Sequence, residues 1–210
     1  MDLSFVHIDR ANQYIDDILS GRIIACDEVK WACLRQKRDL ARQNTEGFPY
    51  VFDERRAELP CKFIEMFPHV KGIWKGKKFK LEPFQCFIVT TIFGWHDAEN
   101  NRRRFNSCYC ELPRKQGKSI LAGGIALYCL MVDDLEPTPE IYIAATTLEQ
   151  AGEVFEPCKE MIDSVPEIKK LFKVETYSKS ISKSSVFSIP NEIKKRSIFV
   201  RELITQYPPI

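Results

Sequence analysis

Apolar residues in the first 45 positions recur at the three- and four-residue spacing of amphipathic helices. Ile15, Ile18 and Leu19 follow this spacing, and Gly21 is placed to end the first helix. A second helix is predicted from Glu28 to Gln43. Acidic and basic residues alternate evenly here, which is typical of a helical extension packed on a neighbouring domain.

From residue 81 onward the apolar runs become longer. Pro83 suits the first turn of a helix that ends near Gly94. The alternating run from Phe105 to Leu112 predicts a strand, and the apolar run from Ile120 to Val132 predicts a buried helix. A buried strand and a further helix are predicted over residues 140–145 and 148–164. Strands alternating with helices predict an α/β domain with a parallel sheet.

A Gly-Lys-Ser triplet, Gly117 to Ser119, lies between the predicted strand and the buried helix. A helix that begins at such a turn directs backbone N–H groups at an anion, and its dipole favours negative charge there. The triplet matches only the second half of the usual phosphate-loop pattern, because Leu112 stands where the first Gly is expected. Its place between strand and helix, and the charges of Arg114 and Lys115, favour phosphate binding over a plain surface turn.

The composition limits the class of protein. The chain has 210 residues, is 44% hydrophobic and carries a net charge of +2, which provides a substantial core and argues against a bulk polyelectrolyte partner. The longest apolar run is too short to span a bilayer. The eight cysteines are scattered, so a cytosolic protein with free, mostly buried thiols is expected.

Two basic segments are candidate DNA contacts. One surrounds Trp74, and the other precedes the predicted strand at Phe105. Solvated loops are the alternative for both segments. The candidate residues are Lys75, Lys77, Lys78, Arg102, Arg103 and Arg104.

Acidic and metal-binding motifs are scarce. Asp133 and Asp134 continue the buried helix, so they do not form the Mg²⁺-binding acidic motif, which must end a separate strand. After residue 145 there is no run of four apolar residues followed by Asp-Glu, and no acidic cluster suited to two-metal nuclease chemistry. A metal site that joins the Cys108–Cys110 pair to His69 or His96 is possible by geometry, but buried thiols are the favoured interpretation.

Several segments resemble, in order and spacing, the large subunit of tailed-phage terminases. They are Leu81–Gln85, Gly94–Trp95, Leu112–Ser119, Ile120–Tyr128, Ile143–Thr147 and Gln150–Ala151. In that family an N-terminal P-loop ATPase drives DNA into the procapsid, a C-terminal nuclease cuts the concatemer, and a phosphate loop without its first Gly is tolerated. The resemblance implies an α/β fold with a P-loop NTPase-like parallel sheet flanked by helices.

The resemblance also implies roles for individual residues, with ATP and Mg²⁺ as cofactors. Lys118 would contact the β- and γ-phosphates, Ser119 would ligate Mg²⁺, and Gln85 would face adenine. The implied nucleotide-binding residues are Gln85, Arg114, Lys115, Gln116, Gly117, Lys118 and Ser119. The implied partners are double-stranded DNA, the terminase small subunit, the capsid portal and further copies of the chain in a ring, in the cytoplasm of a bacterial host.

The departures from the family set further expectations. We expect a helical extension over residues 1–80, a partial ATPase domain over 81–185 and a divergent tail over 186–210, with the fold incomplete at the C-terminus. The acidic (Walker B) motif and the nuclease domain are absent from the sequence, which suggests a truncated or frame-shifted form. We therefore expect weak or absent ATP hydrolysis. The alternative is a non-catalytic DNA- or partner-binding module with a vestigial nucleotide loop.

Overall fold

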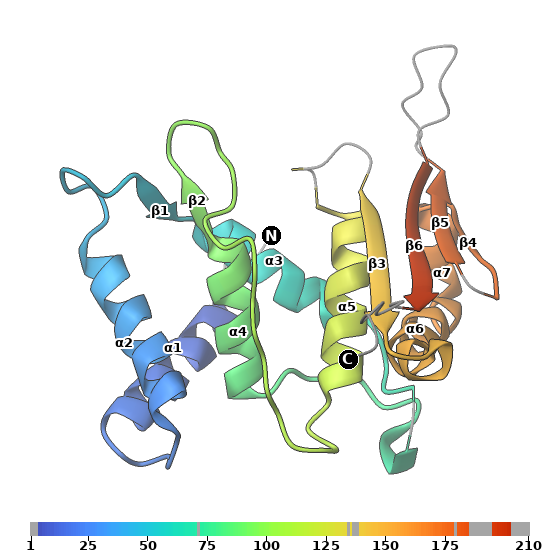
Figure 1. The fold of residues 1–210 in the computed structure, drawn as a ribbon, viewed down its shortest axis with the longest axis horizontal. Coiled ribbons are helices and arrows are strands. Elements are labelled where there is room, and N and C mark those ends of the chain that lie inside the picture. Colours follow the sequence, from blue (N-terminus) through green and yellow to red (C-terminus); the bar gives the residue numbers. More distant parts are fainter. Residues whose placement is uncertain are drawn as a thin grey trace, which may run out of the picture. The chain divides into compact units, whose positions relative to one another are not determined.

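The computed structural model describes residues 4–70, 72–133, 135, 139–178, 180–184 and 195–202, with the backbone alone for 184 and 195–202. The helices are α1 Val6–Leu19, α2 Asp27–Ala41, α3 Glu54–Ile64, the 3-10 helix η1 Gly72–Trp74, α4 Pro83–Gly94, α5 Lys118–Met131, α6 Leu148–Asp163 and α7 Pro166–Leu171 (Figure 1). The strands are β1 Tyr50–Phe52, β2 Trp95–Asp97, β3 Glu140–Ala145, β4 Val174–Thr176, β5 Ser180–Ser184 and β6 Lys195–Glu202.

These elements form two compact units. The first combines the chain up to Glu65 with Lys80–Glu111, and the second combines Met66–Phe79 with the chain from Leu112 onward. The division differs from the predicted boundary at residue 80, because the apolar helix α4 packs against α1 and α3 and so belongs to the first unit. The predicted helical extension is therefore completed by α4.

The first unit has a core of helices and a two-stranded sheet, whose strands are separated in the chain by α3, η1 and α4. Helix α4 begins at Pro83, as predicted, and buries most of its surface because nearly all its residues are apolar. Strands β1 and β2 pair antiparallel with Tyr50 opposite Asp97 and Phe52 opposite Trp95. Trp95 is fully buried and packs its ring edge to face against Phe52, at 5.3 Å between centroids.

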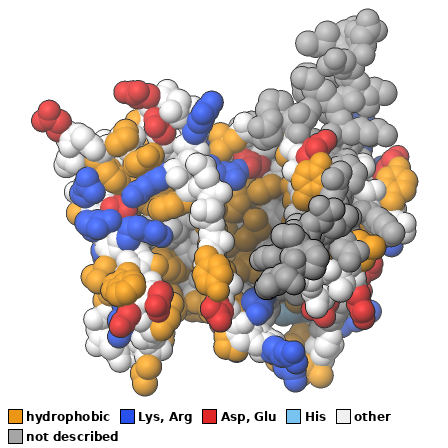
Figure 2. Space-filling model, in the orientation of Figure 1, with side chains coloured by type: hydrophobic (Ala, Val, Ile, Leu, Met, Phe, Trp, Pro, Cys, Tyr) orange, Lys and Arg blue, Asp and Glu red, His pale blue; other side chains and the backbone are white. Residues whose placement is uncertain are grey.

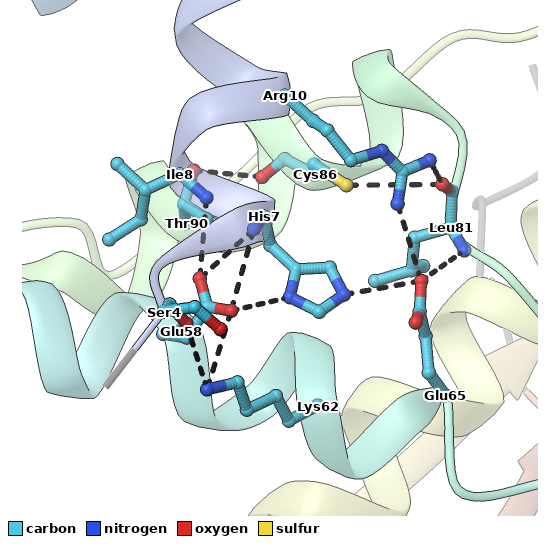
Figure 3. A network of polar contacts seen from close by, with 10 residues as sticks. All are labelled: Ser4, His7, Ile8, Arg10, Glu58, Lys62, Glu65, Leu81, Cys86 and Thr90. Carbon is cyan, nitrogen blue, oxygen red and sulfur yellow. Dashed lines mark hydrogen bonds and ion pairs between the residues drawn. The ribbon is translucent and has the colours of Figure 1, made fainter. Parts of the chain in front are cut away.

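A buried polar network joins α1 to α3 and to the start of α4 (Figure 3). The ring of His7 lies between two carboxylates, with Nδ1 2.7 Å from Glu58 Oε1 and Nε2 3.2 Å from Glu65 Oε1. Glu58, only 2% exposed, also accepts hydrogen bonds from the backbone N–H groups of His7 and Ile8 at the start of α1. A carboxylate at a helix N-terminus satisfies N–H groups that have no partner within the helix.

The second unit contains a four-stranded sheet in the order β3-β6-β5-β4. Strands β3 and β6 run parallel, with Ile141 opposite Ile198, whereas β6, β5 and β4 are joined antiparallel. The α/β class is confirmed, but the sheet is mixed and not wholly parallel as predicted. Strand β6 lies within residues 186–210, which were predicted to be a divergent tail, and its backbone forms part of the sheet.

Two predicted strands differ from expectation. Strand β3 is present, but its residues alternate between exposed and half-buried, and Tyr142 is 46% exposed. Helices α5 and α6 contact β3, so the alternation indicates that one face of the strand is covered and the other is open. The run from Phe105 to Leu112 is not a strand: it spans the boundary between the two units, and residues 106–111 are exposed. An exposed segment outside a sheet lacks the burial and the ladder hydrogen bonds that offset the entropy of ordering a strand.

Helix α5 packs closely on α6. A Cβ placed on Gly123 would lie 3.0 Å from Sγ of Cys158, a buried residue of α6. A buried helix was predicted here. A glycine in a helix interior lowers stability by about 1 kcal/mol relative to alanine. A larger residue at Gly123 would crowd α6, which explains why a glycine stands in this helix.

Half of the eight cysteines are buried, fewer than predicted. All eight are free thiols; Cys26, Cys108 and Cys110 are exposed, and Cys129 is intermediate. The buried ones are Cys33, Cys61, Cys86 and Cys158. Burial raises the pKa of the Cys158 thiol to about 12 and that of Cys86 to about 11, so these groups stay protonated at neutral pH.

Candidate nucleotide-binding loop

The loop Leu112–Ser119 leads directly into helix α5. Its last residue before the helix, Gly117, occupies the N-cap position with φ +74°, a left-handed conformation that glycine adopts at little cost. Lys115 also has a positive φ of +68°, although it carries a Cβ. Two left-handed residues in three positions turn the chain sharply into α5.

The start of α5 has the features of an anion site. The first backbone N–H groups of a helix have no acceptor within it, and no side chain caps this end. The body of α5 is apolar and largely buried, so its axis is fixed by packing on α6. A phosphate at this end would receive hydrogen bonds from backbone N–H groups and would meet the positive end of the helix dipole.

Three cationic side chains lie on this turn. Arg114, Lys115 and Lys118 are all exposed, whereas Ser119, one residue inside α5, is half-buried. The Lys118 Nζ donates a hydrogen bond to the carbonyl oxygen of Leu112, at 2.5 Å. This contact folds the ammonium back across the loop, so that it joins the first residue of the loop to the first residue of the helix.

The carboxyl end of β3 carries a second polar turn in the same unit. Thr147 is the N-cap of α6, and its Oγ1 accepts a hydrogen bond from the backbone N–H of Gln150 at 3.2 Å. The Oγ1 of Thr146 donates to Gln150 Oε1 at 2.6 Å. These three polar side chains therefore fix the turn from β3 into α6.

The register of β6 brings an acidic residue to this same edge of the sheet. Glu202, the last residue of β6, stands opposite Ala145, the last residue of β3, and Arg201 stands opposite Ala144. Because β3 and β6 are parallel, both strands end at the same edge. No acidic strand motif was predicted here, because only three apolar residues and then Arg201 precede Glu202, whereas the motif has four apolar residues followed by Asp-Glu.

Comparison with known proteins identifies the family. The family model described as terminase large subunit, ATPase domain, matches residues 83–195, which is more than half of the 210-residue chain. The chain belongs to the terminase large subunit ATPase family. The match includes every segment on which the predicted resemblance rested except Leu81 and Glu82.

Two comparisons find similarity to the large terminase of one phage. The terminase large subunit of Enterobacteria phage HK97 is 26% identical over 127 residues, which is 60% of this chain and 24% of that protein. The crystal structure of the HK97 bacteriophage large terminase matches with a TM-score of 0.48 at 21% identity, over 74% of this chain and 28% of the other. The chain thus spans about a quarter of the length of these relatives.

Not every residue predicted for the terminase site lies in the unit that contains the loop. Gln85, predicted to face adenine, belongs to the first unit and is only 3% exposed. Its Oε1 accepts a hydrogen bond from the backbone N–H of Glu82 at 2.9 Å, so the side chain caps the start of α4. The adenine contact remains a prediction, and the described contact gives Gln85 a structural role.

The arginine triplet is partly structural as well. The Arg104 guanidinium pairs with Asp39, at 2.7 Å between Nη2 and Oδ2, and lies 4.8 Å from the ring centroid of Tyr50. Arg103 lies over the ring of Phe93 at 4.7 Å. Arg102 alone of the three has an exposed side chain. Arg104 is thus held inside the first unit, and this counts against the DNA contact predicted for it.

The described residues offer neither a metal-binding cluster nor a membrane-spanning helix. These residues contain no group of three or more His, Cys, Asp or Glu side chains arranged to hold a metal ion. The alternative in which Cys108 and Cys110 share a metal with a histidine therefore gains no support there; His96 is buried and its Nδ1 lies 3.2 Å from the Gly94 carbonyl. None of the described helices is long and apolar enough to cross a membrane.

Proposed function

We propose that the chain binds a magnesium nucleoside triphosphate at Leu112–Ser119 as part of an ATP-driven packaging motor for viral DNA. The observation that carries the proposal is the geometry of this turn. A left-handed Gly117 opens a buried apolar helix whose first residue is Lys118, with its ammonium folded over the loop. Membership of the terminase ATPase family supports ATP as the nucleotide.

The residues present fit the phosphates and the metal ion. Lys118, with the N–H groups at the start of α5, would hold the β- and γ-phosphates, and the Ser119 hydroxyl would hold Mg²⁺. Arg114, Lys115 and Gln116 would flank the phosphates from the exposed side of the loop. When bound, MgATP supplies the phosphoryl group whose transfer to water drives DNA movement in this family.

We extend the proposal to Glu202 as the acidic partner of the loop. Its register position, at the carboxyl end of a strand parallel to β3, is the edge at which α/β sheets place their ligands. A carboxylate there can accept hydrogen bonds from Mg²⁺-bound water. Glu202→Gln should therefore reduce the gain in nucleotide affinity that Mg²⁺ provides and leave affinity in EDTA unchanged. An unchanged Mg²⁺ effect would rule out this role.

The central test is titration with a fluorescent ATP analogue in the presence of Mg²⁺. Lys118→Ala removes a charge-assisted contact worth about 1.5–3 kcal/mol, so a loss of affinity of about tenfold or more is expected. Lys170→Ala is the matched control, since this exposed lysine lies on α7 in the same unit. Equal affinities of the wild type and Lys118→Ala would refute nucleotide binding at the loop.

A second function is favoured by the exposed lysines around Trp74. In this alternative the chain is a non-catalytic module that binds DNA or a partner, and the nucleotide loop is vestigial. It predicts DNA binding without measurable ATP affinity. Association with a terminase small subunit, a capsid portal or further copies in a ring belongs to either function. ATP turnover by this chain is still expected to be weak or absent.

A further inference from the structure

Residues Met66–Phe79, which we call the basic hairpin, concentrate positive charge. Four lysines and one histidine lie in this segment, with no Asp or Glu. The charge of these lysines exceeds the net charge of +2 of the whole chain, so the rest of the chain is net acidic. Such local asymmetry indicates a partner that is a polyanion.

Backbone hydrogen bonds hold the basic hairpin in shape. Pro68 and Lys78 form an antiparallel bridge. His69 and Lys77 are joined by a hydrogen bond from N–H to C=O at 2.8 Å, and Gly76 donates to the His69 carbonyl, also at 2.8 Å. Left-handed glycines at Gly72, φ +74°, and Gly76, φ +82°, flank the tip. These contacts hold the described residues of the basic hairpin in a defined conformation.

The base of the hairpin is buried and its tip is exposed. Phe67 is fully buried, and Phe79 is only 4% exposed. At the tip, η1 presents Ile73 at 87% and Trp74 at 53% exposure. Burying one such apolar side chain is worth about 1.5–3 kcal/mol, so two adjacent exposed ones at an ordered tip indicate a contact surface.

The lysines surround this apolar tip. Lys75, Lys77 and Lys78 are all exposed, and none of them forms an ion pair with an acidic side chain of the described residues. The Lys77 ammonium lies 4.6 Å from the ring centroid of Trp74, which places charge directly beside the exposed indole. Figure 2 shows a small group of Lys and Arg side chains at the lower edge of this face.

We propose that the basic hairpin is a DNA-binding element that contacts double-stranded DNA with both its lysines and its apolar tip. Lys75, Lys77 and Lys78 contact phosphates, while Ile73 and Trp74 enter the minor groove against sugars and base edges. Duplex DNA carries one charge per about 1.7 Å of axis, so closely spaced lysines find partners at any position along it. This inference rests on the DNA-handling part of the proposed function and is independent of its nucleotide-binding part.

The test measures binding of a fluorescent 30-base-pair duplex by anisotropy over a series of salt concentrations. Two variants of the full chain separate the two kinds of contact: K75Q/K77Q/K78Q and I73S/W74A. The matched control, K30Q/K37Q/K170Q, removes the same charge from exposed or half-exposed lysines elsewhere. Circular dichroism melts confirm that each variant is folded.

The expected results differ between the variants. The lysine variant should lose about 100-fold in affinity near 0.1 M salt, and the slope of log K against log salt should fall by about three. The tip variant should lose about tenfold with its slope unchanged, because apolar contacts release no counterions. The control should lose much less than the lysine variant.

Three outcomes would overturn the inference. They are equal losses in the lysine variant and the control, full affinity of the tip variant, and displacement of the duplex by polyglutamate at equal charge concentration. The last would point to an acidic protein as the partner. ATP-analogue titrations of the same variants keep the two proposals apart: the hairpin variants should bind nucleotide normally, and Lys118→Ala should bind DNA normally.

Discussion

The ion pair between Arg104 and Asp39 provides a test of whether the arginine triplet serves DNA binding or folding. Replacing Arg104 by Gln removes the guanidinium but keeps a polar side chain of moderate length. Asp39 is only 1% exposed, so the change leaves a buried carboxylate without its main partner. A smaller contact remains, because Arg38 Nε lies 3.2 Å from Asp39 Oδ1 and its side chain is 62% exposed.

The size of the effect follows from these contacts. Removing one partner of a buried ion pair lowers the free energy of unfolding by about 3–5 kcal/mol. The remaining Arg38 contact lowers that figure, whereas the loss of packing raises it, since the Arg104 guanidinium also lies within 5.3 Å of the ring centroids of Phe48, Tyr50, Trp95 and Phe105. We therefore expect Arg104→Gln to lower the free energy of unfolding by about 3 kcal/mol.

Urea denaturation followed by tryptophan fluorescence measures this change. With an m-value near 2 kcal/mol/M, the midpoint should fall by about 1.5 M. Arg102→Gln is the matched control; this exposed neighbour should shift stability by less than about 0.5 kcal/mol. Arg104→Lys should rescue little, because an ammonium cannot reproduce the planar stacking between rings. If Arg104→Gln instead kept its stability and lost affinity for duplex DNA, a role of Arg104 in stabilising the fold would be refuted.

Three further predictions concern other parts of the fold. Thr147→Ala should cost about 1 kcal/mol by removing the N-cap of α6, measured by thermal denaturation, with Thr147→Ser retaining stability. A thiol reagent at pH 8 should label the exposed Cys108 and Cys110 rapidly, but Cys158 only on unfolding, because burial raises the pKa of the Cys158 thiol to about 12. Mass spectrometry of the labelled peptides measures this order, and early modification of Cys158 would contradict it. Burial and the nearby Arg56 charge lower the pKa of His96, so the free energy of unfolding should fall as the pH drops below the ordinary histidine pKa of 6.5. His96→Asn should reduce this dependence of stability on pH, measured by urea titrations between pH 7 and 5.

Elements governed by local sequence were predictable. Helix α4 follows from Pro83 at its first turn and an apolar body, and α5 from an apolar run after the Gly-Lys-Ser triplet. The helix α6 was predicted within one residue, because apolar residues such as Ala151, Val154 and Phe155 recur at helical spacing. These signals depend on residues within one or two helical turns of each other, so the helices can be predicted without knowledge of the tertiary structure.

Features that depend on distant partners were not predictable. The alternation in Phe105–Leu112 is that of a strand, yet a strand forms only where a neighbour supplies its hydrogen bonds. Arg104 looked like part of a basic surface, and only its ion pair with Asp39, 65 positions earlier in the chain, shows its burial. Ile73 and Trp74 were also missed as a unit, since an exposed apolar pair is recognisable only when the fold shows what remains uncovered.

The register of strand β6 places an acidic residue at the edge of the sheet that no sequence motif predicts. The acidic motif has two adjacent acids after four apolar residues, and Lys195–Glu202 lacks it because three apolar residues and then Arg201 precede Glu202. Pairing with β3 fixes the position of each residue independently of its neighbour's type, and it puts Glu202 level with Ala145 at the carboxyl edge. In a parallel pair that edge is shared by both strand ends. The register alone therefore places an acidic residue at the edge where the sequence pattern required two adjacent acids, and Glu202→Gln tests whether that residue serves the nucleotide loop.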